Sequence, residues 1–187
     1  DASYFDIEAQ GPFEEFIVPG SLGRIQVSNV TSKLNVVTSN RRLHIEDVSG
    51  RIKAVTTNSS LVARNVKARD GEATFRNEGG DISIVGVSGE INVRNSYGRT
   101  EIDMFEATGR KSYVKSQYGP IQIRLTAIDG GQLIVTNQYE DIEISLPVDI
   151  SAEFSLAVEE DGRIEVYNFP FKPDLVLQNR LSLISGD

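Results

Sequence analysis

The stretch that decides the fold reads DISIVGVSGEINVRN over residues 81–95. Apolar residues alternate with polar ones at Ile82 and Ile84, and the alternation resumes at Ile91 and Val93 after a turn rich in Gly and Ser. Short alternation of this kind is typical of a β-strand with one buried face. The stretch therefore predicts two short strands joined by a small-residue turn.

The same pattern returns about every 20 residues along the chain. Pairs of the form apolar-x-apolar begin at intervals of 18, 18, 21, 20, 19, 21 and 22 residues. Their first members are Ile25, Leu43, Leu61, Ile82, Ile102, Ile121, Ile142 and Ile164. An antiparallel two-sheet sandwich also has short strands and frequent turns, but it gives no reason for a fixed interval. We therefore predict an all-β fold, a parallel β-solenoid like a single-stranded β-helix, with about seven to eight coils of about 20 residues.

Stacked coils place equivalent side chains above one another, so the repeat also predicts which residues face the core. We expect a first inward ladder that contains Ile25, Leu43, Leu61, Ile82, Ile102, Ile121 and Ile142. We expect a second inward ladder that contains Val37, Val55, Phe75, Val93, Val114 and Val135.

The two ends of the chain differ from this repeating middle. Residues 1–20 contain aromatic residues separated by Gly and Pro, and we expect them to form an N-terminal cap or the first strands. Residues 21–187 are expected to form one solenoid domain, and its final turn-like residues 185–187 suggest that the last coil is incomplete. Because the chain begins at Asp1 and not at Met, we expect that a segment was removed, and a secretion signal, a membrane anchor and a simple cut in a longer chain all stay open.

Composition restricts the chemistry of the chain. It has 187 residues, a formal net charge of −8, no Cys and a single His. The negative charge argues against binding to nucleic acids or to anionic membranes, which requires a basic surface. Thiolate nucleophiles, thiolate zinc sites and clusters of several histidines are excluded. We expect no metal, no cofactor, no nucleic-acid partner and no membrane insertion of this segment, because no apolar run approaches the roughly 20 residues needed.

Three turns match one another more closely than the rest. They read NSYG over residues 95–98, SQYG over residues 116–119 and NQYE over residues 137–140. Their tyrosines are expected to stack as a column, with Asn95, Ser116 and Asn137 beside it. Aromatic rings at a regular rise can bind sugars or a partner chain, and their hydroxyl groups can hydrogen-bond. The binding candidates here are Tyr97, Tyr118, Tyr139, Asn95 and Asn137, and the alternative is a packing ladder that stiffens the turns.

Two sets of charged residues are further candidates. Arg76, Arg94 and Lys115 follow inward residues, so they are expected to form a basic stripe on the outer face that binds an acidic glycan or another anionic polymer. The alternative is that these charges keep sheet faces from associating. Carboxylates that could serve a polysaccharide-cleaving enzyme are Glu101, Asp103, Glu106, Asp141 and Glu143. Asp103 and Glu143 are expected two coils apart, at roughly 10 Å, and a solvated acidic face is the simpler interpretation.

The coil pattern resembles that of a known family. The run from Gly80 to Val93 is similar to DUF4097, a bacterial adhesin-like domain of unknown function, and residues 141–154 resemble the closing segment of that family. The similarity covers about residues 21–187 and weakens over residues 62–73, where basic residues interrupt the pattern. The resemblance implies a right-handed β-solenoid that is exported or anchored at a bacterial membrane, and it brings no catalytic residues.

Together these observations favour a non-enzymatic, extracytoplasmic module that binds, adheres or acts as a scaffold at the cell surface or in the periplasm. The expected partner is a glycan or another cell-surface protein. Two alternatives remain open. One is a carbohydrate-active β-helix enzyme that acts on a polysaccharide. The other is a self-assembling scaffold similar to bactofilins, in which open coil ends stack end to end.

Overall fold

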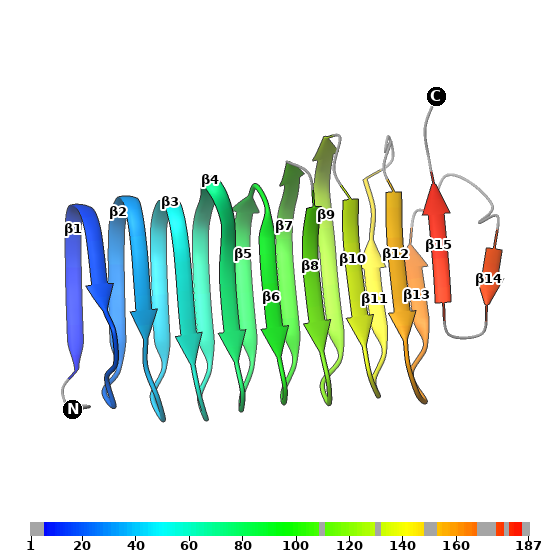
Figure 1. Cartoon of the computed structure of the whole chain (residues 1–187), viewed down its shortest axis with the longest axis horizontal. Coiled ribbons are helices and arrows are strands. Elements are labelled where there is room, and N and C mark those ends of the chain that lie inside the picture. The colour runs from blue at the N-terminus through cyan, green and yellow to red at the C-terminus, as the bar shows by residue number, and fades with distance from the viewer. Residues whose placement is uncertain are drawn as a thin grey trace.

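The computed structural model describes residues 6–108, 111–129, 132–147, 153–167, 175–177 and 180–184. All regular structure in these residues is β-strand, and 15 strands belong to one continuous sheet. The sheet winds around the long axis of the molecule in about seven turns (Figure 1). The chain is therefore an all-β solenoid, which confirms the prediction from the repeat.

Long strands that curve from one side of the solenoid to the other form the first coils. They are β1 (Ile7–Val18), β2 (Ile25–Val37), β3 (Leu43–Thr56) and β4 (Leu61–Asn77). Each later coil uses two shorter strands. These are β5 (Ile82–Ser88) with β6 (Ile91–Asn95), β7 (Thr100–Thr108) with β8 (Lys111–Ser116), β9 (Ile121–Asp129) with β10 (Gln132–Asn137), and β11 (Ile142–Ser145) with β12 (Glu153–Val158). The last strands are β13 (Ile164–Tyr167), β14 (Leu175–Leu177) and β15 (Arg180–Ile184).

Parallel pairing between successive coils creates two layers. The first layer contains the first halves of β1–β4 and then β5, β7, β9, β11 and β13. The second layer contains the second halves of β1–β4 and then β6, β8, β10 and β12. The chain crosses from the first layer to the second at a bend edge, and it returns to the next coil at a turn edge, the lower edge in Figure 1.

The core lies between the layers, where alternate residues of the strands from β2 to β12 are buried. The first predicted ladder is confirmed except at one position. Ile82 pairs with Thr100, whereas Ile102 pairs with Ile84 and Ile123. Thr100 and Ile102 are both buried, because they lie two residues apart on the same side of β7. The prediction placed Ile102 opposite Ile82, where the structure has Thr100. It did so because the search was for apolar residues, and Thr is polar even where it is buried.

The second predicted ladder is wrong in its first two coils. Val37 and Val55 are partly exposed on the outer face, and the buried residues are their neighbours Val36 and Ala54. Val36 pairs with Ala54, and Ala54 pairs with Phe75. Each of these strands carries two consecutive apolar residues, so alternation alone could not decide which one faces the core. The small Ala54 thus pairs with the large Phe75 of the next coil, and both are fully buried. The remaining members are buried as predicted, namely Phe75, Val93, Val114 and Val135.

The two ends of the solenoid are built differently. β1 pairs in parallel with β2, so residues 7–18 supply the first strands and are not a separate cap. At the other end β12 pairs with β15 in an antiparallel manner, and β15 pairs with β14 in the same manner. Parallel stacking of the second layer therefore stops at β12. The interpretation of residues 185–187 as an incomplete coil lies outside the described residues. Within the described part of the chain, no helix is long and apolar enough to span a membrane.

Candidate functional site

The three predicted tyrosines form a stacked column at the turn edge. The ring centroids of Tyr97 and Tyr118 lie 4.9 Å apart with planes at 13°, and those of Tyr118 and Tyr139 lie 4.9 Å apart with planes at 5°. Pairing of the preceding residues, Asn95 with Ser116 and Ser116 with Asn137, holds the three turns in register. The prediction of an aromatic column is confirmed.

Stacking decides which parts of these rings can meet a ligand. The inner ring faces cover one another, so the edges and hydroxyl groups point to solvent. Tyr97 is 56% exposed, compared with 43% for Tyr118 and 36% for Tyr139. Tyr97 is more open because the corresponding residue one coil earlier is Gly79, which has no side chain. The column thus offers one free ring face and a row of phenol groups.

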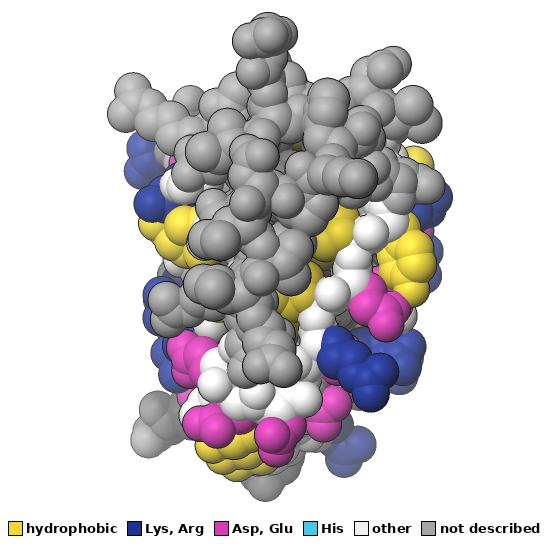
Figure 2. Space-filling model, turned by 90° about the vertical axis from the view of Figure 1, so that its right-hand side faces the viewer, with side chains coloured by type: hydrophobic (Ala, Val, Ile, Leu, Met, Phe, Trp, Pro, Cys, Tyr) yellow, Lys and Arg dark blue, Asp and Glu magenta, His cyan; other side chains and the backbone are white. Residues whose placement is uncertain are grey.

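The phenol group of Tyr139 lies in an environment that favours its protonated form. Desolvation raises the pKa of Tyr139 above its usual value, and the neighbouring Tyr118 and the carboxylate of Glu160 raise it further. A raised pKa keeps the phenol protonated over a wider pH range. Acidic side chains gather at the lower edge of the C-terminal end, as Figure 2 shows, and the exposed acidic residues of these turns are Glu140, Asp141, Glu159, Glu160 and Asp161.

The asparagines beside the column lie beneath the surface. Asn95 is 4% exposed and Asn137 is 0% exposed. The amide of Asn95 donates to the carbonyls of Gly80 and Gly98 at 3.1 and 3.0 Å, and that of Asn137 donates to Gly119 at 3.0 Å. These side chains therefore stabilise the turns and do not face a ligand. Alternation could have shown this, because Val93 and Asn95 lie on the same side of β6.

The basic stripe consists of Arg76, Arg94 and Lys115, and all three are exposed on the outer face of the second layer. They pair directly across β4, β6 and β8. Arg76 forms an ion pair with Glu78 at 2.9 Å, and Arg94 donates to Asn92 at 3.3 Å. Lys115 has no partner among the described residues. The stripe and the column share two coils, since Tyr97 follows Arg94 and Tyr118 follows Lys115 by three residues.

Sequence reasoning missed a further cation and ring on this outer face. The ammonium group of Lys111 lies 5.4 Å from the centroid of the Tyr113 ring. Both residues are exposed, and Tyr113 is next to Lys115 in the outward alternation of β8. The alternation of β8 alone could have placed all three on one face.

The candidate carboxylates for catalysis lie in three separate places. Asp103 and Glu143 line one hollow of about 280 Å³ together with Glu101, with Gln122 and Arg124 also in its wall. Glu106 lies at the bend edge, in a different groove. Asp141 lies at the turn edge, where its carboxylate accepts the backbone N–H of Arg163 at 2.7 Å.

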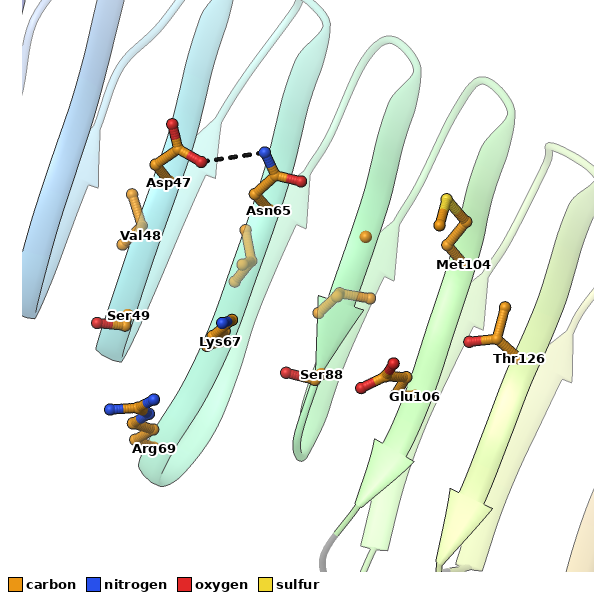
Figure 3. A pocket seen from close by; sticks show the side chains of 13 residues that line it. Asp47, Val48, Ser49, Asn65, Lys67, Arg69, Ser88, Met104, Glu106 and Thr126 are labelled. Carbon is orange, nitrogen blue, oxygen red and sulfur yellow. Dashed lines mark hydrogen bonds between the residues drawn. The ribbon is translucent and has the colours of Figure 1, made fainter.

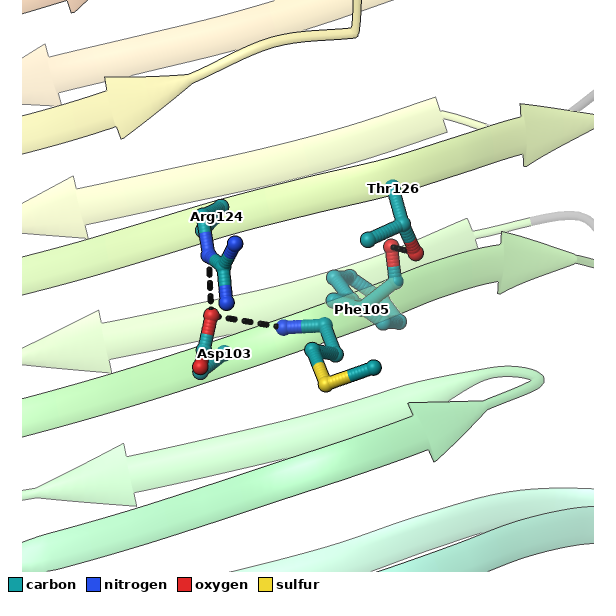
Figure 4. Close-up of polar contacts among 5 residues, drawn as sticks. Asp103, Phe105, Arg124 and Thr126 are labelled. Atoms are coloured by element: carbon teal, nitrogen blue, oxygen red, sulfur yellow. Dashed lines mark hydrogen bonds and ion pairs between the residues drawn. The ribbon is translucent and has the colours of Figure 1, made fainter.

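Two of the three carboxylates in the hollow, Asp103 and Glu143, already have partners. Asp103 accepts hydrogen bonds from the guanidinium of Arg124 and from the backbone N–H of Met104 (Figure 4). The hydrogen bond from Arg124 is the main reason that the pKa of Asp103 lies below its usual value, so this carboxyl group is ionised at neutral pH. Glu143 accepts a hydrogen bond from Gln122 at 2.8 Å. Hydrolysis by a pair of carboxyl groups requires one that keeps its proton, and Asp103 is unsuited to that role.

A groove of about 550 Å³ follows the bend edge across β3 to β9 (Figure 3). One side of it is a column of residues with left-handed backbone conformation, a feature that sequence reasoning missed. Their φ angles are 53° at Asp47, 51° at Asn65, 69° at Gly86 and 53° at Met104. Asn, Asp and Gly tolerate this conformation, whereas Met is strained in it. Recurrence of Asn, Asp or Gly at coil spacing was the available signal.

Metal binding and known relatives give no further assignment. Among the described residues, no group of three or more His, Asp or Glu side chains could hold a metal ion. The chain has no significant match among protein-family models, curated proteins or solved structures. The resemblance to DUF4097 therefore stays a prediction.

Proposed function

We propose that this chain is a non-enzymatic, extracytoplasmic binding module that holds a linear acidic glycan along the tyrosine column and the basic stripe. The observation that carries the proposal is their common register. Arg94 and Tyr97 belong to one coil, and Lys115 and Tyr118 belong to the next. Cations and phenol donors thus repeat together at the spacing of the coils.

This arrangement suits a polymer with regularly spaced anionic groups. Successive strands lie about 4.8 Å apart. Two neighbouring coils each offer one cation on the outer face and one phenol at the turn, while Arg76 extends the row of cations on one side and Tyr139 extends the row of phenols on the other. Individual contacts of this kind are weak at an exposed surface. Several contacts on one rigid support add together, because the second and third bind without a new loss of translational freedom.

The cellular setting of the proposal rests on the sequence resemblance, with the cell surface or the periplasm as the site of action. A net charge of −8 repels polyanions in general. Binding therefore depends on the local stripe, and it should weaken as salt screens these exposed charges.

The test uses polygalacturonate as the acidic polymer and dextran as a neutral one, with affinity measured by calorimetry. We expect polygalacturonate to bind and dextran not to bind. The double variant Arg94→Gln/Lys115→Gln should bind about tenfold more weakly, a loss of about 1.4 kcal/mol. The triple variant Tyr97→Phe/Tyr118→Phe/Tyr139→Phe keeps the rings and removes the donors, and it should also bind more weakly. Arg64→Gln is the matched control, because Arg64 is exposed on the outer face of the other layer.

Two outcomes would overturn the proposal. The first is that the wild-type chain binds polygalacturonate no better than dextran. The second is that Arg64→Gln weakens binding as much as the double variant does. Release of new reducing ends from the polymer would contradict the non-enzymatic assignment, and it would make Asp103 and Glu143 the first residues to replace.

A further inference from the structure

A second site lies at the turn edge of the first coils, away from the tyrosine column. It is a polar concavity of about 720 Å³. Three arginines and one carboxylate line it, and the full lining is Asp6, Leu22, Gly23, Arg24, Asn40, Arg41, Arg42, Ser59 and Ser60. We call this concavity the arginine pocket. All three arginines are exposed, and they concentrate positive charge on a chain whose net charge is −8.

A contact that recurs along the solenoid, once in this pocket and twice in later coils, shows what is unusual about Arg42. Three arginines that directly precede a first-layer strand each lie one coil after an aspartate. The aspartate accepts the backbone N–H of that arginine in every case. The distance from the backbone nitrogen of the arginine to Oδ1 of the aspartate is 2.7 Å for Arg24 and Asp6, 2.9 Å for Arg99 and Asp81, and 2.7 Å for Arg163 and Asp141.

Arg42 breaks this rule, because the residue one coil before it is Arg24 and not an aspartate. The backbone N–H of Ile25 donates to the carbonyl of Arg42 at 3.1 Å, which places the two arginines on adjacent coils. The backbone N–H of Arg42 has no acceptor among the described residues. Like charges directly opposite one another on neighbouring strands are destabilising. The position thus combines a missing acceptor with two stacked cations.

The arginine side chains near the backbone N–H of Arg42 have donor groups available for an anion. Arg41 has no partner among the described residues. The guanidinium Nη2 of Arg24 lies 3.7 Å from the carboxylate Oδ2 of Asp6, and both side chains are 63% exposed. Arg42 donates through its Nε to the hydroxyl of Ser60 at 3.2 Å, which leaves its terminal nitrogens available.

We infer that the arginine pocket binds a phosphate or sulfate group, which takes the place of the missing carboxylate. Its oxygens would accept the backbone N–H of Arg42 and the guanidinium groups of Arg24 and Arg41. Arginine suits this role because its planar donors match tetrahedral oxyanions in pairs. This inference goes beyond the proposed function, since it concerns other coils and a single ionic group, not a polymer.

The first test titrates the labelled protein with inorganic phosphate and with sulfate at constant ionic strength, and follows the amide of Arg42 by NMR. We expect a saturable shift of that amide. Arg24→Asp gives Arg42 the kind of carboxylate that Asp6, Asp81 and Asp141 provide for Arg24, Arg99 and Arg163, and it should weaken phosphate binding about tenfold or more. Arg41→Gln should also weaken it. Arg99→Gln is the matched control, because Asp81 already serves that coil, and it should leave phosphate affinity unchanged.

The second arm of the experiment distinguishes the sources of the anion. A sulfated oligosaccharide is compared with a carboxylated one of the same length, and phosphatidylcholine vesicles are compared with and without a phosphoinositide. If the sulfated sugar binds more tightly than free sulfate, the natural source is a sulfated glycan. If the phosphoinositide vesicles bind more tightly than free phosphate, the source is a lipid headgroup. The inference is overturned if neither phosphate nor sulfate shifts the Arg42 amide more than chloride does. It is equally overturned if Arg24→Asp binds phosphate as well as the wild type. Failure of the polygalacturonate experiment would leave this result unaffected, because Arg94 and Lys115 do not line the arginine pocket.

Discussion

The two edges of the solenoid follow different rules. At the turn edge five successive connections between coils have four residues each, and they are residues 57–60, 78–81, 96–99, 117–120 and 138–141; the connections before and after them, residues 19–24, 38–42 and 159–163, are longer by one or two residues. At the bend edge the length varies, and β4 carries additional residues between Ala68 and Ala73 that β3 does not have. Figure 1 shows the same contrast, with even turns below and uneven bends above. Constant length keeps the tyrosine rings stacked from coil to coil. The arginine pocket lies at the same edge, at the first coils.

The inward ladders that both edges join should be the most sensitive part of the molecule. We expect Val114→Asp to lower the free energy of unfolding by about 3 kcal/mol or more, because it buries a charge without a partner. Val114 is 1% exposed and pairs with Val93 and Val135. Lys115→Asp, at the exposed neighbouring position, should change stability by about 0.5 kcal/mol or less. Urea unfolding checks both, and equal midpoints for the two variants would contradict the assigned register.

The two edges should differ in how much stability an inserted residue costs. One Gly inserted between Gln117 and Tyr118 displaces a ring from the tyrosine column and should cost about 2 kcal/mol. One Gly inserted after Gly71 at the bend edge should cost about 0.5 kcal/mol or less, since loop length is inexpensive where no ladder is interrupted. Gly71 has open space beside it. Thermal unfolding of the two variants provides the measurement. A larger loss from the Gly71 insertion would reverse the ranking of the edges.

The buried amide at the turn edge should matter more than a hydroxyl at the bend edge. Asn95→Ala removes an amide that donates to carbonyls of two coils, and it should cost about 1–3 kcal/mol because those carbonyls lose their donor. Ser49→Ala removes a bond to the carbonyl of Thr31 at an exposed position, and it should cost about 0.5 kcal/mol. Urea unfolding of both variants compares the edges. Similar losses would show that the asparagine is not required by the turn.

The smallest expected effect is a gain. Met104→Asn at the bend edge replaces a residue strained at φ 53° with the type found at Asn29 and Asn65, whose φ angles are 59° and 51°. We expect the free energy of unfolding to rise by about 0.5–1 kcal/mol, since Asn accepts the left-handed conformation at a lower cost. Thr126→Asn, a neighbouring exposed position of the groove, serves as the control and should give no gain. A loss of stability in Met104→Asn would mean that the Met side chain makes a compensating contact.

Sequence periodicity predicted the solenoid and the tyrosine column because both depend on recurrence along the chain. It did not predict register where neighbouring residues were equally apolar, as at Val36 and Val37, or where a buried polar residue such as Thr100 held an inward position. It missed the arginine pocket for another reason. The pocket is a departure from a rule, and the rule becomes visible only when Asp6, Asp81 and Asp141 are seen to accept backbone N–H groups.

The tyrosine column also gives the molecule a built-in optical reporter. The chain contains no Trp, so its near-ultraviolet signals come from Tyr and Phe alone. Rings stacked 4.9 Å apart couple electronically, and this coupling should give the folded protein a tyrosine circular-dichroism band. The band should vanish when the later coils unwind, even if the earlier ones persist. Unwinding that starts at one end of the rod would therefore be detectable without a label.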